Sequence, residues 1–146
     1  MARTYTQNAA TRVINWVFTT MTRLGLGASY RYLLTVRGRK TGRLYTTPVD
    51  VMETGGQRWL VAGYGPANWV RNARAAGEVT LSRGGHEARY VIAEPAPGEA
   101  VSVLRKYLTD IRVTRPYFDA TPSSPDSELE AELPRHPVLR LIPETD

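Results

Sequence analysis

Cysteine is absent from this sequence of 146 residues, and histidine occurs only at His86 and His136. Without thiols the chain can form neither a disulfide framework nor a thiolate metal site. The two histidines are far apart in the sequence, so we expect no metal site and predict each to be a surface or strand residue. The motif G-x-S-x-G is also missing, which argues against a Ser-His-Asp hydrolase.

Long hydrophobic runs are missing as well. The best candidate, VINWVFTTMT, has ten residues between Arg12 and Arg23 and contains asparagine and threonine. A membrane-spanning helix needs about 20 predominantly apolar residues, so this run is too short and too polar. We therefore expect a cytoplasmic protein.

The same segment has a helical pattern. Over residues 8–24, apolar side chains recur at three- and four-residue spacing, which predicts a helix. Two interpretations stay open: the apolar stripe packs over one face of a sheet, or it rests on a membrane surface with Arg12 and Arg23 beside it. The stripe consists of Val13, Ile14, Trp16, Val17, Phe18, Met21 and Leu24.

Acidic residues are absent from residues 1–49, which contain eight Lys and Arg, whereas residues 121–146 contain six acids and two Arg. The formal net charge is +5. This asymmetry indicates an anionic partner near the first half of the chain.

Short runs of β-forming residues alternate with turn signals along most of the chain. The predicted strands are 32–36, 44–52, 58–62, 78–82, 87–94 and 137–143, with helices starting near Asn68 and spanning about 99–109. This order predicts a mainly β, antiparallel fold with flanking helices, either a small barrel or an α+β sheet. The length fits a single domain over residues 1–146, with an N-terminal helix and linker at 1–27 and an irregular loop at 114–136.

Two local features refine this expectation. Pro48 cannot donate a ladder hydrogen bond, so its strand should have an edge or a bulge there. No regular βαβ alternation occurs and no G-x-G-x-x-G opens a helix after a strand, so we expect no Rossmann nucleotide site.

The stretch RGRKTGRLYTTP, residues 37–48, concentrates cations in one predicted turn. Gly38 and Gly42 should permit positive φ, and backbone N–H groups in such turns can converge on an anion. Three interpretations compete: a solvated hairpin turn, a nucleic-acid contact and a cradle for one phosphate. Nucleic-acid binding requires cations spread along a face with aromatics for stacking, which this single loop does not provide.

A second segment, VAGYGPANWVRNARAAGEV at residues 61–79, ends a strand in small residues and then starts a helix. Small residues let a flat ring lie against the backbone, and free N–H groups at a helix start bind ring carbonyls or anions. Asn68 is the expected N-cap, and Trp69 offers a flat wall. The alternative is an ordinary strand, turn and helix with a core tryptophan.

The two segments TVRGRKTGRLYTTP and AGYGPANWVRNARA together resemble the deazaflavin-dependent nitroreductase and quinone reductase family, over about residues 10–143. The resemblance implies a split β-barrel related to flavin-binding oxidases and the coenzyme F-420, with FMN as the alternative cofactor. Arg39, Lys40, Thr41 and Arg43 would hold the cofactor phosphate and its acidic tail. Thr46, Thr47 and Pro48 would shape the strand beside the ring, Ala62, Gly63, Tyr64 and Gly65 would contact the ring, and Trp69 and Asn72 would complete the wall on the tail side.

The resemblance further implies a reductase that passes hydride to a quinone-like or nitroaromatic small molecule. The alternative is a non-catalytic flavin- or deazaflavin-binding protein of the same fold. Three tyrosines, Tyr64, Tyr107 and Tyr117, are candidates for orienting the acceptor, and Tyr64 and Tyr117 are preferred. The family's N-L and N-P become Asn72-Ala73 and Ala76-Gly77 here, which weakens inference about the substrate pocket. The oligomeric state and a peripheral membrane contact of the first helix stay open.

Overall fold

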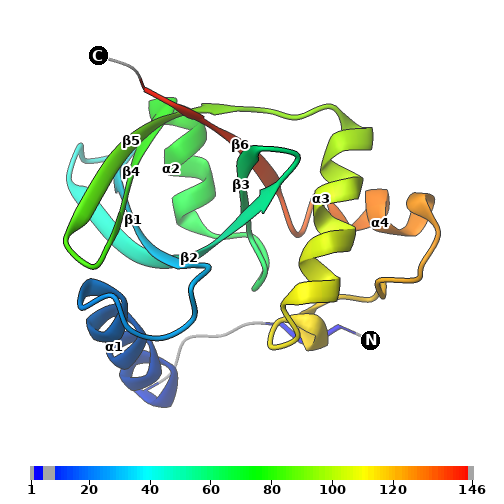
Figure 1. The fold of residues 1–146 in the computed structure, drawn as a ribbon, viewed down its shortest axis with the longest axis horizontal. Helices are drawn as coiled ribbons and strands as arrows, with labels where there is room; N and C mark the ends of the chain where they lie inside the picture. The colour runs from blue at the N-terminus through cyan, green and yellow to red at the C-terminus, as the bar shows by residue number, and fades with distance from the viewer. Residues whose placement is uncertain (1, 5–8, 145–146) are drawn as a thin grey trace.

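The computed structural model describes residues 2–4 and 9–144, and within them six β-strands close into an antiparallel barrel (Figure 1). The strand order around the barrel is β1-β2-β3-β6-β5-β4, with β4 returning to β1. This confirms the predicted mainly β, split-barrel fold. The strands are β1 (Arg31–Arg37), β2 (Leu44–Thr54), β3 (Gln57–Val61), β4 (Glu78–Arg83), β5 (His86–Ala93) and β6 (Val138–Pro143). The helices are α1 (Ala9–Arg23), α2 (Asn68–Ala76), α3 (Pro97–Asp110), the 3-10 turn η1 (Arg115–Tyr117) and α4 (Asp126–Glu132).

Side-chain alternation along the strands divides the apolar residues between two cores. Leu60 of β3 points into the barrel, while its neighbours Trp59 and Val61 point outward against α3. This follows from the two-residue period of a strand. Helix α2 closes the barrel interior by contributing Val70 and Ala73, so its position is fixed by burial.

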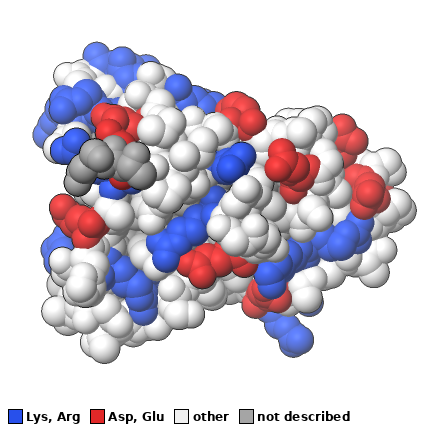
Figure 2. Space-filling view, turned by 45° about the horizontal axis from the view of Figure 1, so that its top comes forward, with Lys and Arg blue, Asp and Glu red and all other residues white. Residues whose placement is uncertain are grey.

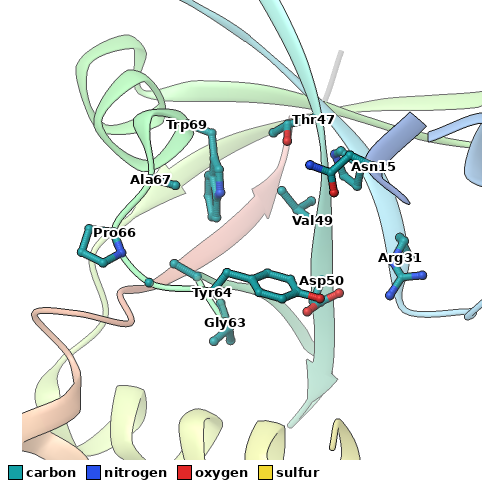
Figure 3. Close-up of a pocket in the computed structure, with 14 residues that line it drawn as sticks. Asn15, Arg31, Thr47, Val49, Asp50, Gly63, Tyr64, Pro66, Ala67 and Trp69 are labelled. Carbon is teal, nitrogen blue, oxygen red and sulfur yellow. The ribbon is translucent and has the colours of Figure 1, made fainter. Parts of the chain in front are cut away.

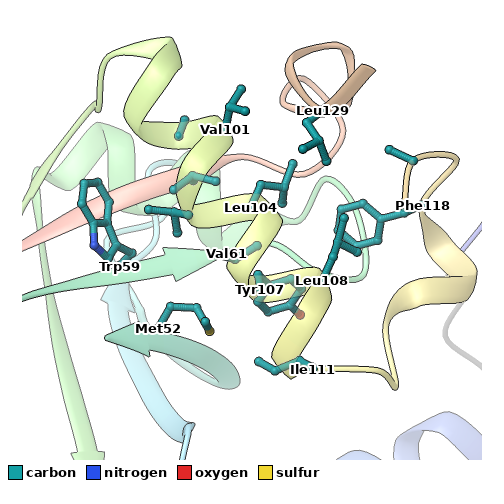
Figure 4. Close-up of a cluster of buried hydrophobic side chains, with 14 residues drawn as sticks. Met52, Trp59, Val61, Val101, Leu104, Tyr107, Leu108, Ile111, Phe118 and Leu129 are labelled. Atoms are coloured by element: carbon teal, nitrogen blue, oxygen red, sulfur yellow. The ribbon is translucent and has the colours of Figure 1, made fainter. Parts of the chain in front are cut away.

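The outer core lies between the barrel and α3 (Figure 4). Leu104 and Leu108 of α3 are fully buried there, together with Leu129 and Phe118 from the last third of the chain. The irregular loop predicted for 114–136 is therefore wrong in part, because it contains η1 and α4. A composition rich in Pro, Ser and acids hides the short helix, which packing of Leu129 stabilises more than intrinsic propensity does.

The barrel is split along the first half of β2. This strand pairs with β1 from Leu44 to Asp50, but its ladder with β3 begins only at the Asp50–Val61 pair. Pro48 pairs with Leu33 of β1 and lies beyond the end of the β3 ladder. The predicted edge at Pro48 is confirmed, and the open edge faces the segment that connects β3 to α2.

Helix α1 lies across one end of the barrel (Figure 1). It contacts β1, β2 and β4, and Thr22 in its last turn is buried. Most of its apolar stripe is nevertheless exposed, with Val13 at 62% and Trp16 at 69% of full exposure. The expected packing over a sheet face thus holds for only part of the helix; residue 8 and the side chain of Phe18 lie outside what the structure describes. None of the described helices combines the length and apolarity that a membrane crossing requires.

Candidate functional site

Two adjoining pockets open at the split. The larger has a volume of about 580 Å³ and lies between the basic turn and the start of α2. The smaller, about 160 Å³, lies between β2 and the loop after β3 (Figure 3). Both are lined by Thr47, Pro66, Ala67 and Trp69, so they form one continuous cleft.

The basic turn between β1 and β2 is held by its own backbone. Gly38 N–H donates to the carbonyl of Arg43 at 2.6 Å, and the Arg37 guanidinium donates to the carbonyl of Gly42 at 2.7 Å. Gly42 has φ of 76°, as expected, whereas the expectation of positive φ at Gly38 is wrong. An added Cβ at Gly38 would lie 2.5 Å from the exposed ring of Tyr45, so a side chain there would force that ring to shift.

Asn72 of α2 fastens this turn to the helix. Its Oδ1 accepts hydrogen bonds from the Arg39 backbone N–H at 3.1 Å and from Arg39 Nη1 at 2.7 Å. Asn72 is buried whereas Arg39 is exposed, so the two bonds are partly buried and anchor the turn to the helix surface. The turn is therefore pre-positioned beside the larger pocket, which Arg39, Lys40 and Thr41 line.

The start of α2 faces the same pocket. The N-cap is Ala67, which has no capping side chain, and not Asn68 as expected. Asn68 instead accepts a hydrogen bond from Arg71 at 3.3 Å, because it already lies inside the helix. A helix start without a side-chain cap presents N–H groups and the positive end of the helix dipole to the pocket.

The smaller pocket has walls of small residues and flat side chains. Ala62 and Gly63 are buried and form one wall, Trp69 lies at the junction with the larger pocket, and Tyr64 is partly exposed at the rim (Figure 3). Gly65 has φ of 109°, which residues with a Cβ rarely adopt. The chain therefore turns sharply here and leads back into α2.

Gly63 allows a buried tyrosine to approach from behind. A Cβ at Gly63 would lie 1.9 Å from the hydroxyl oxygen of Tyr107 and 3.0 Å from the methyl carbon of Thr114. Tyr107 is fully buried and donates a 2.7 Å hydrogen bond to Oδ2 of Asp50. The glycine thus serves packing behind the pocket wall, a role that its position in the motif does not reveal.

Asp50 is a site residue that the sequence analysis missed. It is 7% exposed and lines the smaller pocket with Arg31. Burial raises the pKa of Asp50, and the hydrogen bond from Tyr107 and the charge of Arg31 oppose this only in part. Burial, followed by the charge of Asp50, raises the pKa of Tyr107 well above its ordinary value. The available signal was a lone acid, the first in the sequence, between Val49 and Val51 in a buried strand.

Tyr64, which lines the smaller pocket, contacts Tyr117, the second preferred tyrosine. The rings of Tyr64 and Tyr117 meet edge to face, with centroids 5.3 Å apart. Between their loops lies His136, whose Nδ1 is 2.8 Å from the carbonyl of Ala62 and whose Nε2 is 2.9 Å from the carbonyl of Tyr117. His136 is buried, so the expectation of a surface or strand residue is wrong for it; its role is to connect loops.

The structure brings most of the predicted cofactor residues into the cleft. Arg43 and Tyr117 line neither pocket, although Arg43 belongs to the basic turn and Tyr117 contacts Tyr64. The larger pocket contains Arg39, Lys40, Thr41, Thr46, Thr47, Trp69 and Asn72. The smaller one contains Thr47, Pro48, Ala62, Gly63, Tyr64, Gly65 and Trp69.

Charges of both signs lie side by side on the face shown in Figure 2. Ion pairs such as Arg74–Glu94 and Lys106–Asp110 join cations to carboxylates on the surface. Among residues 2–4 and 9–144, no cluster of three or more His, Asp or Glu side chains could hold a metal ion.

Solved structures share this architecture. The chain is similar to HutZ, a heme storage protein of Vibrio cholerae, with 11% identity, a TM-score of 0.54, and coverage of 80% of this chain and 83% of that one. It is also similar to an F420-H2 dependent reductase (FDR-A), with 20% identity, a TM-score of 0.52 and coverage of 77% and 93%. The protein Atu2129 of Agrobacterium tumefaciens, of unknown function, gives 17% identity, a TM-score of 0.57 and coverage of 97% and 58%. At these identities the likeness establishes the fold class alone.

The family follows from the sequence. Residues 9–122 match the model of the F420H(2)-dependent quinone reductase family, and the chain belongs to that family. The resemblance derived from the two motifs is thereby confirmed. No curated protein sequence matches the chain.

Proposed function

We propose that the protein is a reductase that uses reduced coenzyme F-420 to deliver hydride to a quinone-like or nitroaromatic acceptor in the cytoplasm. One observation carries the proposal. The split in the barrel joins a cation-lined pocket at a helix start to a flat-walled pocket at a sheet edge. A molecule with an anionic tail at one end and a planar ring at the other matches this cleft from end to end.

The residues present fit such a coenzyme by their chemistry. Arg39, Lys40 and the Thr41 hydroxyl would hold the phosphate and the acidic tail, with Arg43 adding positive charge at the turn. The start of α2 supplies further N–H donors. Asn72 acts indirectly in this arrangement, because its side-chain oxygen is occupied by Arg39.

The ring would lie in the smaller pocket. Thr46, Thr47 and Pro48 form the open edge of β2 on one side, and the backbone from Ala62 to Gly65 forms the other. When bound, the coenzyme supplies the hydride chemistry itself, which explains why the protein requires neither cysteine nor a metal ligand set. The protein's task is to hold the acceptor against the ring, and alignment of this kind contributes on the order of 7–11 kcal/mol. Tyr64 in the pocket wall and Tyr117, which contacts it, would orient the acceptor.

Anaerobic titration of the purified protein with the deazaflavin tests binding, and oxidation of the reduced coenzyme with and without menadione tests catalysis. We expect saturable binding and acceptor-dependent oxidation, and weaker binding of FMN. Tight binding without turnover on a panel of quinones and nitroaromatics would leave a non-catalytic binding protein of the same fold. Absence of binding to either cofactor would remove both functions.

The exposed stripe of α1 supports a route for lipid-like acceptors. Val13 and Trp16 are exposed, and Asn15 of the same helix lines the smaller pocket. We propose that this stripe rests on the membrane surface, with Arg12 and Arg23 facing anionic lipid. Vesicles containing anionic lipid should sediment the wild-type protein but not Trp16→Glu. The control Val91→Glu changes an exposed apolar residue on β5 and should leave sedimentation unchanged.

A further inference from the structure

The smaller pocket contains a buried acid that neither cofactor binding nor acceptor orientation explains. Asp50 is 7% exposed, yet it lines the pocket together with Arg31 and Tyr64. In Figure 3 the ring of Tyr64 points toward the carboxyl group of Asp50. Burying a carboxyl group costs free energy unless it is paired, so its place beside a ligand pocket calls for an explanation.

We propose that Asp50 is the proton donor of the reaction and that Tyr107 positions it. This inference rests on the proposed quinone reductase function. When bound, the reduced coenzyme would supply one hydrogen and two electrons to the quinone as hydride, which would leave negative charge on a quinone oxygen. The O–H bond of the Asp50 carboxyl group breaks, an O–H bond forms on that oxygen, and the products are the hydroquinone and the Asp50 carboxylate. Water at the pocket mouth returns the proton to Asp50.

The hydrogen bond from Tyr107 fixes which oxygen of Asp50 acts. Tyr107 donates to Oδ2 at 2.7 Å, and in the proposed acid form the proton is carried on the other oxygen, Oδ1. The hydroxyl of Tyr107 cannot withdraw easily, because its ring is fully buried in the outer core, behind Gly63. The carboxyl group is therefore held in one orientation at the floor of the pocket.

The surroundings of Asp50 support both of its protonation states. Burial raises the pKa of Asp50, which favours the proton-carrying form before reaction. After the transfer, the Tyr107 hydrogen bond and the charge of Arg31 stabilise the carboxylate. The groups that face Asp50 from neighbouring elements are Arg31 of β1, Tyr107 of α3 and Tyr64 of the loop after β3.

Asp50→Asn separates proton donation from a purely structural bond, because the amide oxygen still accepts from Tyr107 but the amide is no acid. We expect a fall in kcat for menadione of about 10²-fold and loss of the decline in rate that the wild type shows as pH rises. The control Asp110→Asn removes a carboxylate paired with Lys106 on α3, outside the pocket, and should keep the wild-type rate and pH profile. Wild-type kcat and pH profile in Asp50→Asn would overturn the inference.

A second measurement needs neither coenzyme nor turnover. Infrared spectra of the ligand-free protein should show the C=O band of a protonated carboxylic acid that shifts in D₂O, fades as pH rises and is missing in Asp50→Asn. In Tyr107→Phe the band should persist to higher pH, because the hydrogen bond that stabilises the carboxylate is gone. If the wild type shows the band but oxidises the coenzyme with no quinone, the proposed function fails. If it turns over but lacks the band at every pH, only the proton donor is wrong.

Discussion

The two ends of the cleft differ in the physics that each uses. At the larger pocket, Arg39 and Lys40 are exposed side chains on a turn, and their attraction for an anion acts through water. At the smaller pocket, Asp50 and Tyr107 are buried and act through desolvation and a fixed hydrogen bond. Binding at the first end should respond to salt, whereas chemistry at the second should respond to packing and pH. In the proposed function, the cleft thus captures the coenzyme at one end and carries out the reaction at the other.

The largest expected effect concerns the smaller pocket, where Tyr107 packs behind Gly63. Gly63→Ala places a Cβ 1.9 Å from the Tyr107 hydroxyl oxygen, and the buried ring has no room to withdraw. Overpacking of this kind costs about 3 kcal/mol in the free energy of unfolding. Urea denaturation measures it.

Gly98→Ala is the matched control. Gly98 lies in the first turn of α3, and a Cβ there would meet no described atom within 4 Å. Its stability should equal or slightly exceed that of the wild type, because alanine favours a helix. Equal stability of Gly63→Ala and Gly98→Ala would show that Tyr107 can move and that the wall of the smaller pocket is not rigid.

The next effect concerns the larger pocket, which Arg39 and Lys40 of the basic turn line. Arg39→Ala and Lys40→Ala should each weaken deazaflavin binding by about 2 kcal/mol at low salt, since each removes a charged hydrogen-bond donor. The difference from the wild type should shrink as ionic strength rises. Isothermal titration at several salt concentrations checks both statements. Lys106→Ala, on α3 and paired with Asp110, should bind as the wild type does; the same loss in that variant would point to net charge alone.

A smaller effect shows whether Asn72 holds Arg39 in place or contacts the coenzyme directly. Because Asn72 Oδ1 binds Arg39 twice, Asn72→Ala should cost about 1 kcal/mol of cofactor binding through disorder of the turn. In the double variant with Arg39→Ala the two losses should not add. Additive losses would mean that Asn72 contacts the coenzyme directly, as the family resemblance implies.

The smallest effect is a change in how stability depends on pH. The pKa of Asp50 is raised in the folded protein above the ordinary 3.8, so its contribution to stability is complete below that value and is lost as pH rises through the folded pKa. Asn cannot ionise, so Asp50→Asn should gain stability relative to the wild type over this window. Urea midpoints measured from about pH 4 to about pH 8 test the sign. A gap that stays constant with pH would show that the two forms of Asp50 fold equally well.

The sequence predicted the strands because each buries one face of a barrel, and alternation with turn signals marks such segments. It also predicted the edge at Pro48, since a missing N–H is visible in the sequence itself. It could not predict the partners of Asp50 and Gly63, because both meet Tyr107, which is more than forty residues away in the chain. His136 was misjudged for the same reason: its neighbours, Ala62 and Tyr117, come from separate loops.

Helical segments were predicted less evenly. The periodicity of α1 gave its bounds almost to the residue, but periodicity does not say what covers an apolar stripe, and Val13 and Trp16 are exposed. Helix α4 has one fully buried apolar residue, Leu129, which is too little for a pattern. A helix could be predicted where several apolar residues recur at helical spacing. A helix that depends on long-range packing, such as α4, could not.

Pro48 also affects the tendency of the protein to aggregate. The first half of β2 is an unpaired sheet edge, and such an edge can form hydrogen bonds with an extended segment of another polypeptide. Pro48 lies within this unpaired edge and has no amide hydrogen, so it interrupts the row of N–H donors that an added strand would need. The open edge is therefore a poor template for strand addition, which protects the protein against aggregation.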